Sequence, residues 1–313
     1  MPAGISGGAR VREEAAEMAL RGPAGHTAES ARPRATGPAP RGLPPRALLV
    51  TIYGLYARDR GGALSVSCLV RLLAALDVDE PAARSLISRL KQRGILQPVA
   101  VSGAAGYGLT ADGRRLLEDG DRRIYGRPRP TLADGWLLAV FSVPESERAQ
   151  RHSLRARLAA LGFGTVSAGV WIGPAHLADE TADVLRLHHL DRYVELFTAA
   201  AVDTRPAEAV ARWWDLSALA QLYRSFTREY RPVLERWGSQ DAGDETAFAD
   251  YIRVVTAWRR LPYRDPGLPA EVLPTDWPGT AAADLFRALR AALSTPAERH
   301  VTSMIGQTEG ERR

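Results

Sequence analysis

Apolar residues first fall into a regular pattern near residue 46. From there they recur at the three- and four-residue spacing of helices, which predicts three helices in succession, at residues 46–59, 65–76 and 81–93. Pro81 lies in the first turn of the third helix, where a missing N–H costs little. A hairpin and a further helix are predicted next, at residues 95–101, 107–110 and 111–120, with a loop at 102–106 inside the hairpin. This order is typical of a winged helix-turn-helix.

The middle third of the chain has a different pattern, in which strands and helices alternate. The predicted order is strand, helix, strand, strand, helix and strand, at residues 136–143, 147–161, 163–169, 170–173, 176–190 and 194–202. A βαββαβ order is that of a ferredoxin-like sandwich. Such a unit implies no function by itself, because one fold carries many activities.

The last third is predicted to be helical. Apolar stripes indicate helices at residues 213–237, 247–261 and 280–293. The segment 262–279 between the last two is rich in proline, so we expect a rigid loop of defined shape there. The fold class is therefore α+β and multidomain, with a winged helix-turn-helix first, a ferredoxin-like βαββαβ domain in the centre and an all-helical domain last.

The composition of the chain helps to show where the folded domains begin and end. The first 44 residues are rich in Gly, Ala, Pro and Arg and bury too little apolar surface to fold, so they are predicted to form a disordered arm. The predicted division is a disordered arm, a winged helix, a linker, a ferredoxin-like domain, a helical domain and a disordered tail, at residues 1–44, 45–120, 121–134, 135–205, 206–300 and 301–313.

Charge and cysteine content narrow the class of protein. The chain of 313 residues has 41 basic and 36 acidic residues, and Lys91 is its single lysine. Guanidinium groups suit phosphate and base edges, although a GC-rich genome produces the same bias. Cys68 is the only cysteine, which excludes an intramolecular disulfide and fits a cytoplasmic location. No run of 18 apolar residues is present, so we expect no membrane partner.

The third predicted helix carries the candidate DNA contacts. Its polar side has five residues at spacings that project them together, Arg84, Ser85, Ser88, Arg89 and Lys91. Arg84 lies early in the helix, where recognition helices read base edges, and its guanidinium suits a guanine O6/N7 pair. Arg89 and Lys91 suit phosphates. The alternative is a small helical domain whose basic face is merely solvated.

Short motifs along residues 45 to 300 resemble the PaaX family of bacterial transcriptional regulators. In the first domain the resemblance rests on Arg84-Ser85-Leu86-Ile87-Ser88-Arg89-Leu90, Tyr107-Gly108-Leu109-Thr110 and Arg122-Arg123-Ile124-Tyr125-Gly126. In the centre it rests on Phe141-Ser142-Val143-Pro144-Glu145, Arg151, Leu154-Arg155, Gly162-Phe163-Gly164 and Gly169-Val170-Trp171. In the last third it rests on Trp214-Asp215-Leu216, Asp265-Pro266-Gly267-Leu268-Pro269, Leu273-Pro274 and Trp277-Pro278-Gly279.

The resemblance implies an N-terminal winged helix, a central domain similar to Cas2 and a family-specific helical domain. It also implies a homodimer that binds a palindromic double-stranded operator and mostly represses. The family's namesake is released by phenylacetyl-coenzyme A, so an acyl-coenzyme A effector is expected here. The family's wing usually carries basic residues, whereas the loop at 102–106 has none. Arginines of the arm are candidates to replace it in the minor groove, namely Arg32, Arg34, Arg41 and Arg46.

Candidate effector contacts lie in the last two domains. Arg151 and Arg155 share a helical stripe that suits a coenzyme A phosphate, while ion pairs with Glu145 or Glu147 are the competing interpretation. The aromatic residues of the helical domain are expected to be mostly core, with some lining an effector pocket, and the candidates are Trp214, Tyr223 and Trp277. Arg264, beside the proline-rich loop, is a candidate phosphate contact.

Two other classes of function compete with a regulator. The Cas2 fold supports phosphodiester cleavage elsewhere, but a metal-dependent nuclease needs a carboxylate at the end of the first strand of that domain. That strand ends in Phe141-Ser142-Val143-Pro144, and Glu145 follows the proline, so we expect no enzyme. The adjacent His188 and His189 point about 100° apart on a helix, so no metal or cofactor is predicted. The uncharged wing suggests the second alternative, an interaction adaptor that does not bind DNA.

Overall fold

The computed structural model describes residues 43–125, 130–201, 203–239 and 243–310. These residues form a mixed α+β chain with one three-stranded and one four-stranded sheet. The chain divides into two compact units. One contains Asp119–Ser225 and Arg259–Ala282, and the other contains residues 43–118, Phe226–Trp258 and 283–310. Among the described residues, no helix has the length and apolar character needed to cross a membrane. The predicted arm lies outside the described residues, except for its last two positions.

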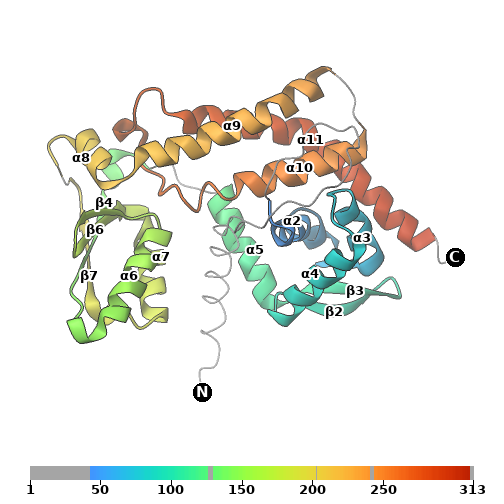
Figure 1. Ribbon diagram of the computed structural model, residues 1–313, viewed down its shortest axis with the longest axis horizontal. Helices are drawn as coiled ribbons and strands as arrows, with labels where there is room; N and C mark the ends of the chain where they lie inside the picture. The colour runs from blue at the N-terminus through green and yellow to red at the C-terminus, as the bar shows by residue number, and fades with distance from the viewer. Residues whose placement is uncertain (1–42, 126–129, 202, 240–242, 311–313) are drawn as a thin grey trace, which may run out of the picture. The chain divides into compact units, whose positions relative to one another are not determined.

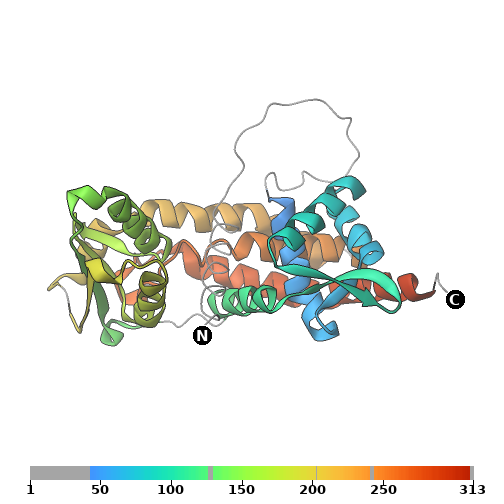
Figure 2. The same cartoon turned by 90° about the horizontal axis from the view of Figure 1, so that it is seen from below.

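The unit with the N-terminal elements contains a three-helix arrangement and a small sheet. Its elements in chain order are α2 (Pro45–Ile52), η1 (Tyr53–Ala57), η2 (Arg58–Arg60), β1 (Ala63–Ser65), α3 (Val66–Ala74), α4 (Glu80–Gln92), β2 (Leu96–Val101), β3 (Ala104–Leu109) and the first part of α5 (Ala111–Ile124). The strands pair antiparallel in the order β1-β3-β2. The hairpin of β2 and β3 is visible in Figure 2. The helices and the hairpin lie near their predicted positions, whereas the three residues of β1 are too few to show an alternating pattern.

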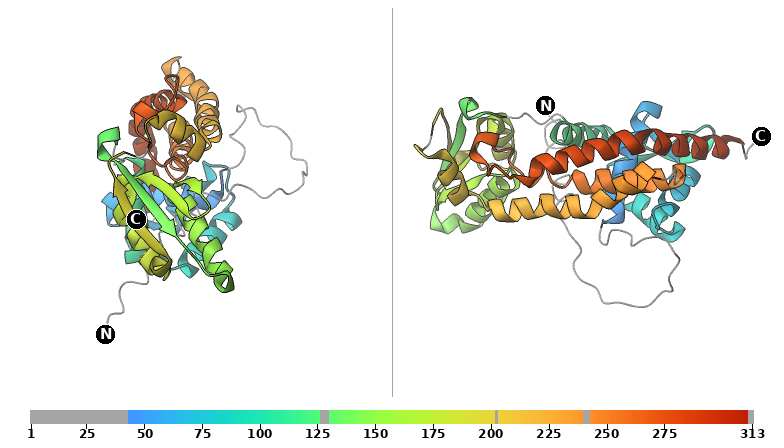
Figure 3. Two further views of the ribbon diagram at one scale, coloured as in Figure 1. Left: turned by 90° about the vertical axis from the view of Figure 1, so that its left-hand side faces the viewer. Right: turned by 90° about the horizontal axis from the view of Figure 1, so that it is seen from above.

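The core of this unit combines N-terminal and C-terminal segments. The apolar stripes of α2 and α3 are fully buried, through Leu49, Ile52, Leu69, Leu72 and Leu73. The C-terminal segments are the later parts of α9 (Leu216–Ser239) and α11 (Pro278–Gly310), together with α10 (Asp244–Trp258). α10 packs against α2, and it lies beside α11 (Figure 3), where the rings of Phe248 and His300 are tilted to each other with centroids 5.1 Å apart.

The other unit contains the predicted ferredoxin-like sandwich. Its elements are β4 (Trp136–Phe141), α6 (Arg148–Ala160), β5 (Gly164–Ser167), β6 (Val170–Pro174), α7 (Ala178–Leu187) and β7 (Val194–Ala199). The strands are antiparallel in the order β5-β6-β4-β7, which confirms the βαββαβ prediction. α6 and α7 cover one face of the sheet (Figure 1), and their core includes Leu137, Leu154 and Leu185.

Part of the opposite sheet face is covered by later segments of the chain. Trp136 and Ile172 of the sheet pack with Val210 of α8 (Pro206–Trp213) and with two residues of the proline-rich loop, Leu268 and Val272. The loop is therefore packed on the sheet and does not act as a loose connector. Its rigidity was predicted from its prolines, but its place on the sheet was not.

The last helix is much longer than predicted. α11 runs to Gly310, so the prediction of a helix ending at residue 293 and a disordered tail from 301 is wrong up to that point. Leu289, Leu293, Ala297 and Val301 follow one another at four-residue spacing, and all are 0% exposed. Pro296 lies inside this helix, where a proline removes one backbone hydrogen bond. The buried stripe on both sides of it outweighs that loss.

Candidate nucleic-acid interface

Local sequence fixes both ends of α4. The carboxylate of Asp79 accepts a hydrogen bond from the backbone N–H of Ala82 (2.8 Å), and Pro81 occupies the first turn. At the other end Gly94 has a φ of 71°, the left-handed conformation with which helices commonly end. The predicted start and end of the third helix are confirmed within one residue.

The two faces of α4 differ sharply in exposure. Ala83, Ile87 and Leu90 are at most 2% exposed and attach the helix to its neighbours. The predicted DNA contacts lie on the remaining surface, with Ser85 half-buried and the other four exposed, namely Arg84, Ser88, Arg89 and Lys91. The structure therefore brings all five together on one solvent-facing helix surface with three positive charges.

Arg84 has a partner on its own helix. Its Nε and Nη2 atoms lie 2.8 Å and 2.7 Å from the same carboxylate oxygen of Glu80, one turn earlier. Both side chains are more than half exposed, and such pairs on helices stabilise by only about 0.2–0.5 kcal/mol. A nucleic acid can therefore displace Glu80 at little cost.

The hairpin after α4 is tighter than predicted. β3 begins at Ala104, so the predicted loop at 102–106 is wrong and only Ser102 and Gly103 connect the strands. Their φ values are 47° and 79°, as in the two-residue turns that match the twist of a hairpin. Position 106, inside the strand, requires a glycine because a Cβ there would come within 2.8 Å of the Leu64 carbonyl oxygen. The hairpin tip thus has the uncharged residues noted from the sequence, at the end of a regular ladder.

The candidate effector arginines of α6 contact the protein itself. Arg151 donates to the carbonyl oxygen of Val143 (2.8 Å) and pairs with Glu145 (2.9 Å), which confirms the competing ion-pair interpretation. Arg155 donates to the carbonyl oxygen of Ala168 (2.9 Å). Both side chains therefore hold loops at the ends of strands. The pairing also engages Glu145, the carboxylate nearest to the position that a nuclease would require.

The candidate effector aromatics belong to packed clusters. Trp214 donates from its indole nitrogen to the carbonyl oxygen of Gly162 (2.8 Å) and lies 6.1 Å from Trp136, centroid to centroid. The Tyr223 hydroxyl donates to Asp265, and its ring meets Trp277 edge-on at 6.1 Å. Arg264 is exposed. Tyr223 and Trp277 are thus brought together, and Trp214 is fixed on a turn of the ferredoxin-like domain.

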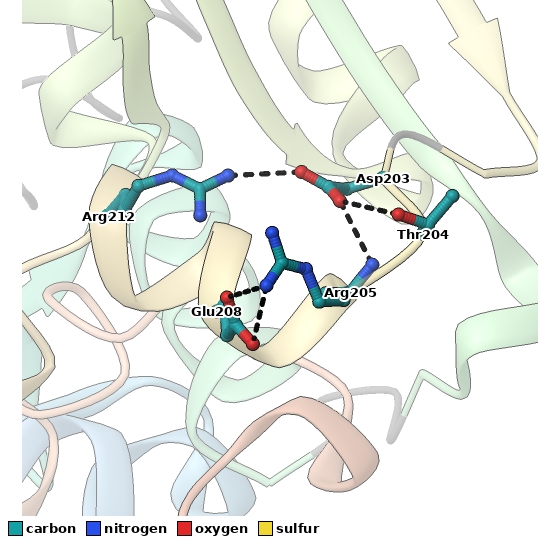
Figure 4. Close-up of polar contacts among 5 residues, drawn as sticks. All are labelled: Asp203, Thr204, Arg205, Glu208 and Arg212. Atoms are coloured by element: carbon teal, nitrogen blue, oxygen red, sulfur yellow. Dashed lines mark hydrogen bonds and ion pairs between the residues drawn. The ribbon is translucent and has the colours of Figure 1, made fainter.

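A cluster of ion pairs precedes α8, and sequence reasoning did not identify it. Asp203 accepts hydrogen bonds from the backbone N–H of Arg205 (2.9 Å) and from Arg212 (3.0 Å), while Arg205 pairs with Glu208 (Figure 4). The backbone bond first, and then Arg212, hold the pKa of Asp203 below its usual range. These contacts fix the start of the helix that packs on the sheet, so the cluster is structural. An Asp three residues before a helix that begins with proline was the available signal.

Metal ligands are not grouped in the described part of the chain. Among those residues, no three His, Cys, Asp or Glu side chains lie together as a metal site would require. His188 and His189 follow the end of α7, where His189 has a φ of 54°, so the two do not lie on a regular helix.

Comparisons with known proteins agree with the order of these regions. Profiles described as PaaX-like protein, PaaX protein central Cas2-like domain and PaaX-like protein C-terminal domain match residues 44–113, 129–211 and 214–303. Transcriptional repressor PaaX of Escherichia coli (strain K12) is 27% identical over 275 residues, 82% of this chain and 84% of that protein.

A solved structure gives the same result for the fold. The uncharacterized protein Rv0674 from Mycobacterium tuberculosis matches with a TM-score of 0.58 and 22% identity, covering 82% of this chain and 98% of that one. That likeness concerns the fold alone. The three profiles follow one another along residues 44–303, and they show that the protein belongs to the PaaX family of transcription regulators.

Proposed function

We propose that the chain is a ligand-responsive, dimeric transcriptional repressor that binds a palindromic operator through a winged helix-turn-helix. In this proposal residues 45–120 form the DNA-binding domain, and an acyl-coenzyme A such as phenylacetyl-coenzyme A releases the operator. The protein acts in the cytoplasm, without a cofactor, and is not an enzyme. The name of the Escherichia coli relative, a transcriptional repressor, supports repression rather than activation.

The observation that carries the proposal is the exposed face of α4. A helix with a buried apolar side and three cations on its other side, followed by a hairpin, presents the features with which this class of domain enters a major groove. Arg84 is assigned to a base edge, and Arg89 and Lys91 to phosphates. Ser85 and Ser88 lie on the same surface and are assigned to nearby backbone or base contacts.

Thermodynamic linkage explains how an effector would release the operator DNA. A ligand can weaken operator binding only if it binds the DNA-incompetent arrangement of the dimer more tightly, and such couplings are typically 1–3 kcal/mol. The exposed Arg264 and the cluster of Tyr223 and Trp277 lie on or beside the same proline-rich loop. We assign the acyl-coenzyme A to this region. Trp214, Arg151 and Arg155 are assigned as further effector contacts, and their present contacts with the protein would have to break for this.

A mobility-shift titration tests the proposal. The full chain is titrated at fixed salt against DNA from the promoter region of its own gene, with and without phenylacetyl-coenzyme A, and with coenzyme A as the ligand control. We expect a specific shift that the thioester reverses and coenzyme A does not. Sedimentation of the protein alone is expected to give a dimer.

Two results would contradict separate parts of the proposal. A specific shift that ignores the thioester would overturn the effector and keep the operator. Binding no tighter than to scrambled DNA, across fragments of the whole genome, would overturn DNA recognition and favour the interaction adaptor.

A further inference from the structure

The turn between α3 and α4 has an unusual backbone. Asp77 has a φ of 63°, a left-handed conformation that is uncommon for residues other than glycine. Its N–H bonds to the carbonyl oxygen of Ala74 (3.0 Å), and the N–H of Val78 bonds to that of Leu73 (3.1 Å). These bonds close the end of α3, and α4 begins three residues later. The conformation of Asp77 therefore sets the direction in which α4 leaves the turn.

The carboxylate of Asp77 is held by a helix far along the chain. Nη2 of Arg253, on α10, lies 2.8 Å from Oδ2 of Asp77. The side chain of Arg253 is 17% exposed and that of Asp77 is 80% exposed. Packing of α10 thus fixes the guanidinium, while the carboxylate projects from the turn to meet it. One residue of the C-terminal helices contacts the point that orients α4.

α10 is itself fixed on the DNA-binding part in a defined register. The Thr51 hydroxyl donates to the carbonyl oxygen of Ala47 (2.9 Å), so the Thr256 hydroxyl donates to Thr51 across the buried interface (2.8 Å). Phe248 packs against Tyr56 with ring centroids 6.0 Å apart. Thr256 follows Arg253 by three residues, so both lie on the same side of α10. A slide or rotation of α10 on α2 would therefore also displace Arg253.

We propose that Arg253 is a positioning residue for α4, through which the placement of α10 sets operator affinity. This inference rests on the proposed function, because it assumes that α4 reads DNA. Arg253 touches no DNA in this role. It holds Asp77, and Asp77 holds the entry to α4.

Two variants remove the ion pair from opposite sides. Asp77→Gly deletes the carboxylate and accepts the left-handed backbone without strain, while Arg253→Met keeps the aliphatic packing of α10 and removes the charge. Simple electrostatics predicts opposite effects, because losing a negative charge strengthens binding to DNA and losing a positive charge weakens it. Positioning predicts that both variants weaken operator binding, by about two- to fivefold as expected for an exposed pair.

The matched control removes a different ion pair from α10. Arg299→Met breaks the pair with Asp244 at the start of α10, which involves none of the turn residues. Operator affinity is measured at fixed salt for wild type, the two variants, their double mutant, Arg253→Lys and Arg299→Met. We expect the double mutant to bind as the single variants do, because the pair is lost only once. Arg253→Lys should recover most of the affinity.

The outcomes separate this inference from the proposed function. Tighter binding by Asp77→Gly would overturn positioning, as would equal losses in Arg253→Met and Arg299→Met. In both cases specific operator binding by the wild type, lost on Arg84→Ala, would leave the proposed function intact. If the wild type itself does not distinguish its operator from scrambled DNA, the proposed function fails, and this inference fails with it.

Discussion

The indole of Trp214 sits directly on the glycine turn that ends α6, with its N–H 2.8 Å from the carbonyl oxygen of Gly162. The approach is possible because the first residue of β5, two positions further along the chain, is also a glycine. A Cβ at position 164 would lie 2.7 Å from two carbons of the Trp214 ring and 2.8 Å from the carbonyl oxygen of Trp213. Gly164 is thus required by the tryptophan that packs on it, whereas Gly162 has a φ of 89° and a Cβ there would lie 2.9 Å from Cβ of Pro266.

We therefore predict that Gly164→Ala destabilises the protein by about 1–3 kcal/mol, the usual cost of overpacking. The measurement is chemical denaturation, in which the midpoint and the slope of the unfolding transition give the free energy of unfolding. Gly238→Ala is the control, because an added Cβ on that residue of α9 meets no atom within 4 Å and alanine favours helix. Equal stability of the two variants would show that position 164 tolerates a side chain beside Trp214.

Arg84→Ala is expected to weaken operator binding by about 1–3 kcal/mol while leaving binding to scrambled DNA nearly unchanged, because a base contact carries sequence preference. Fluorescence titration with both duplexes measures this. Arg287→Ala is the matched control, since Arg287 is similarly exposed and pairs with Asp284 one turn away on α11. A loss that is the same on both duplexes would mean that Arg84 contacts phosphate.

Lys91→Ala is expected to weaken binding to both duplexes alike. A phosphate contact releases a counterion, so removing it should reduce the slope of log affinity against log salt by about one. Titrations at several salt concentrations give the slope, again with Arg287→Ala for comparison. An unchanged slope would remove Lys91 from the interface.

His300 predicts a pH dependence of stability. Burial beside Phe248 holds the pKa of His300 below its usual range, while Glu245 and Asp244 partly oppose that shift. The unfolded chain then binds a proton more tightly than the folded chain. The contribution of neutral His300 to the free energy of unfolding is fully present above about pH 6.5. It is lost as the pH falls from there to the lowered pKa of the folded state.

Denaturation of wild type and His300→Gln between pH 5 and 8 tests this, and the variant should lose less stability as the pH falls through that window. Asp244 also has a lowered pKa, mainly because Arg299 donates to it, but it titrates in a more acidic range. Parallel curves for the two proteins would show that His300 has an ordinary pKa.

Local signals explain what the sequence could predict. Asp79, Pro81 and Gly94 mark the ends of α4 by chemistry within a few residues, so the helix and its polar face could be located. β1 was missed because three residues carry no period. The helix predicted at residues 280–293 was too short because the apolar stripe of α11 continues beyond it, at Ala297 and Val301.

Long-range contacts explain what the sequence could not predict. Arg253 and Asp77 are 176 residues apart, and Thr51 and Thr256 are 205 apart, so no spacing rule connects them. Asp77 alone gave a signal, since Asp after a helix tolerates the left-handed conformation. For Arg151 the residues left two interpretations open, and the structure shows an ion pair with Glu145.

The two-residue turn at Ser102 and Gly103 has a consequence for how this regulator can be retuned. Because the tip is exposed and uncharged, it adds shape to the domain but no attraction for phosphate. Ala105 is exposed in the adjoining strand and lies outside the turn. A lysine there is expected to raise affinity for all DNA and to steepen its salt dependence. With the proposed phosphate contacts of Arg89 and Lys91 on α4, the hairpin would be a second place at which selection or design can change binding strength, and a change there keeps the base contact assigned to Arg84.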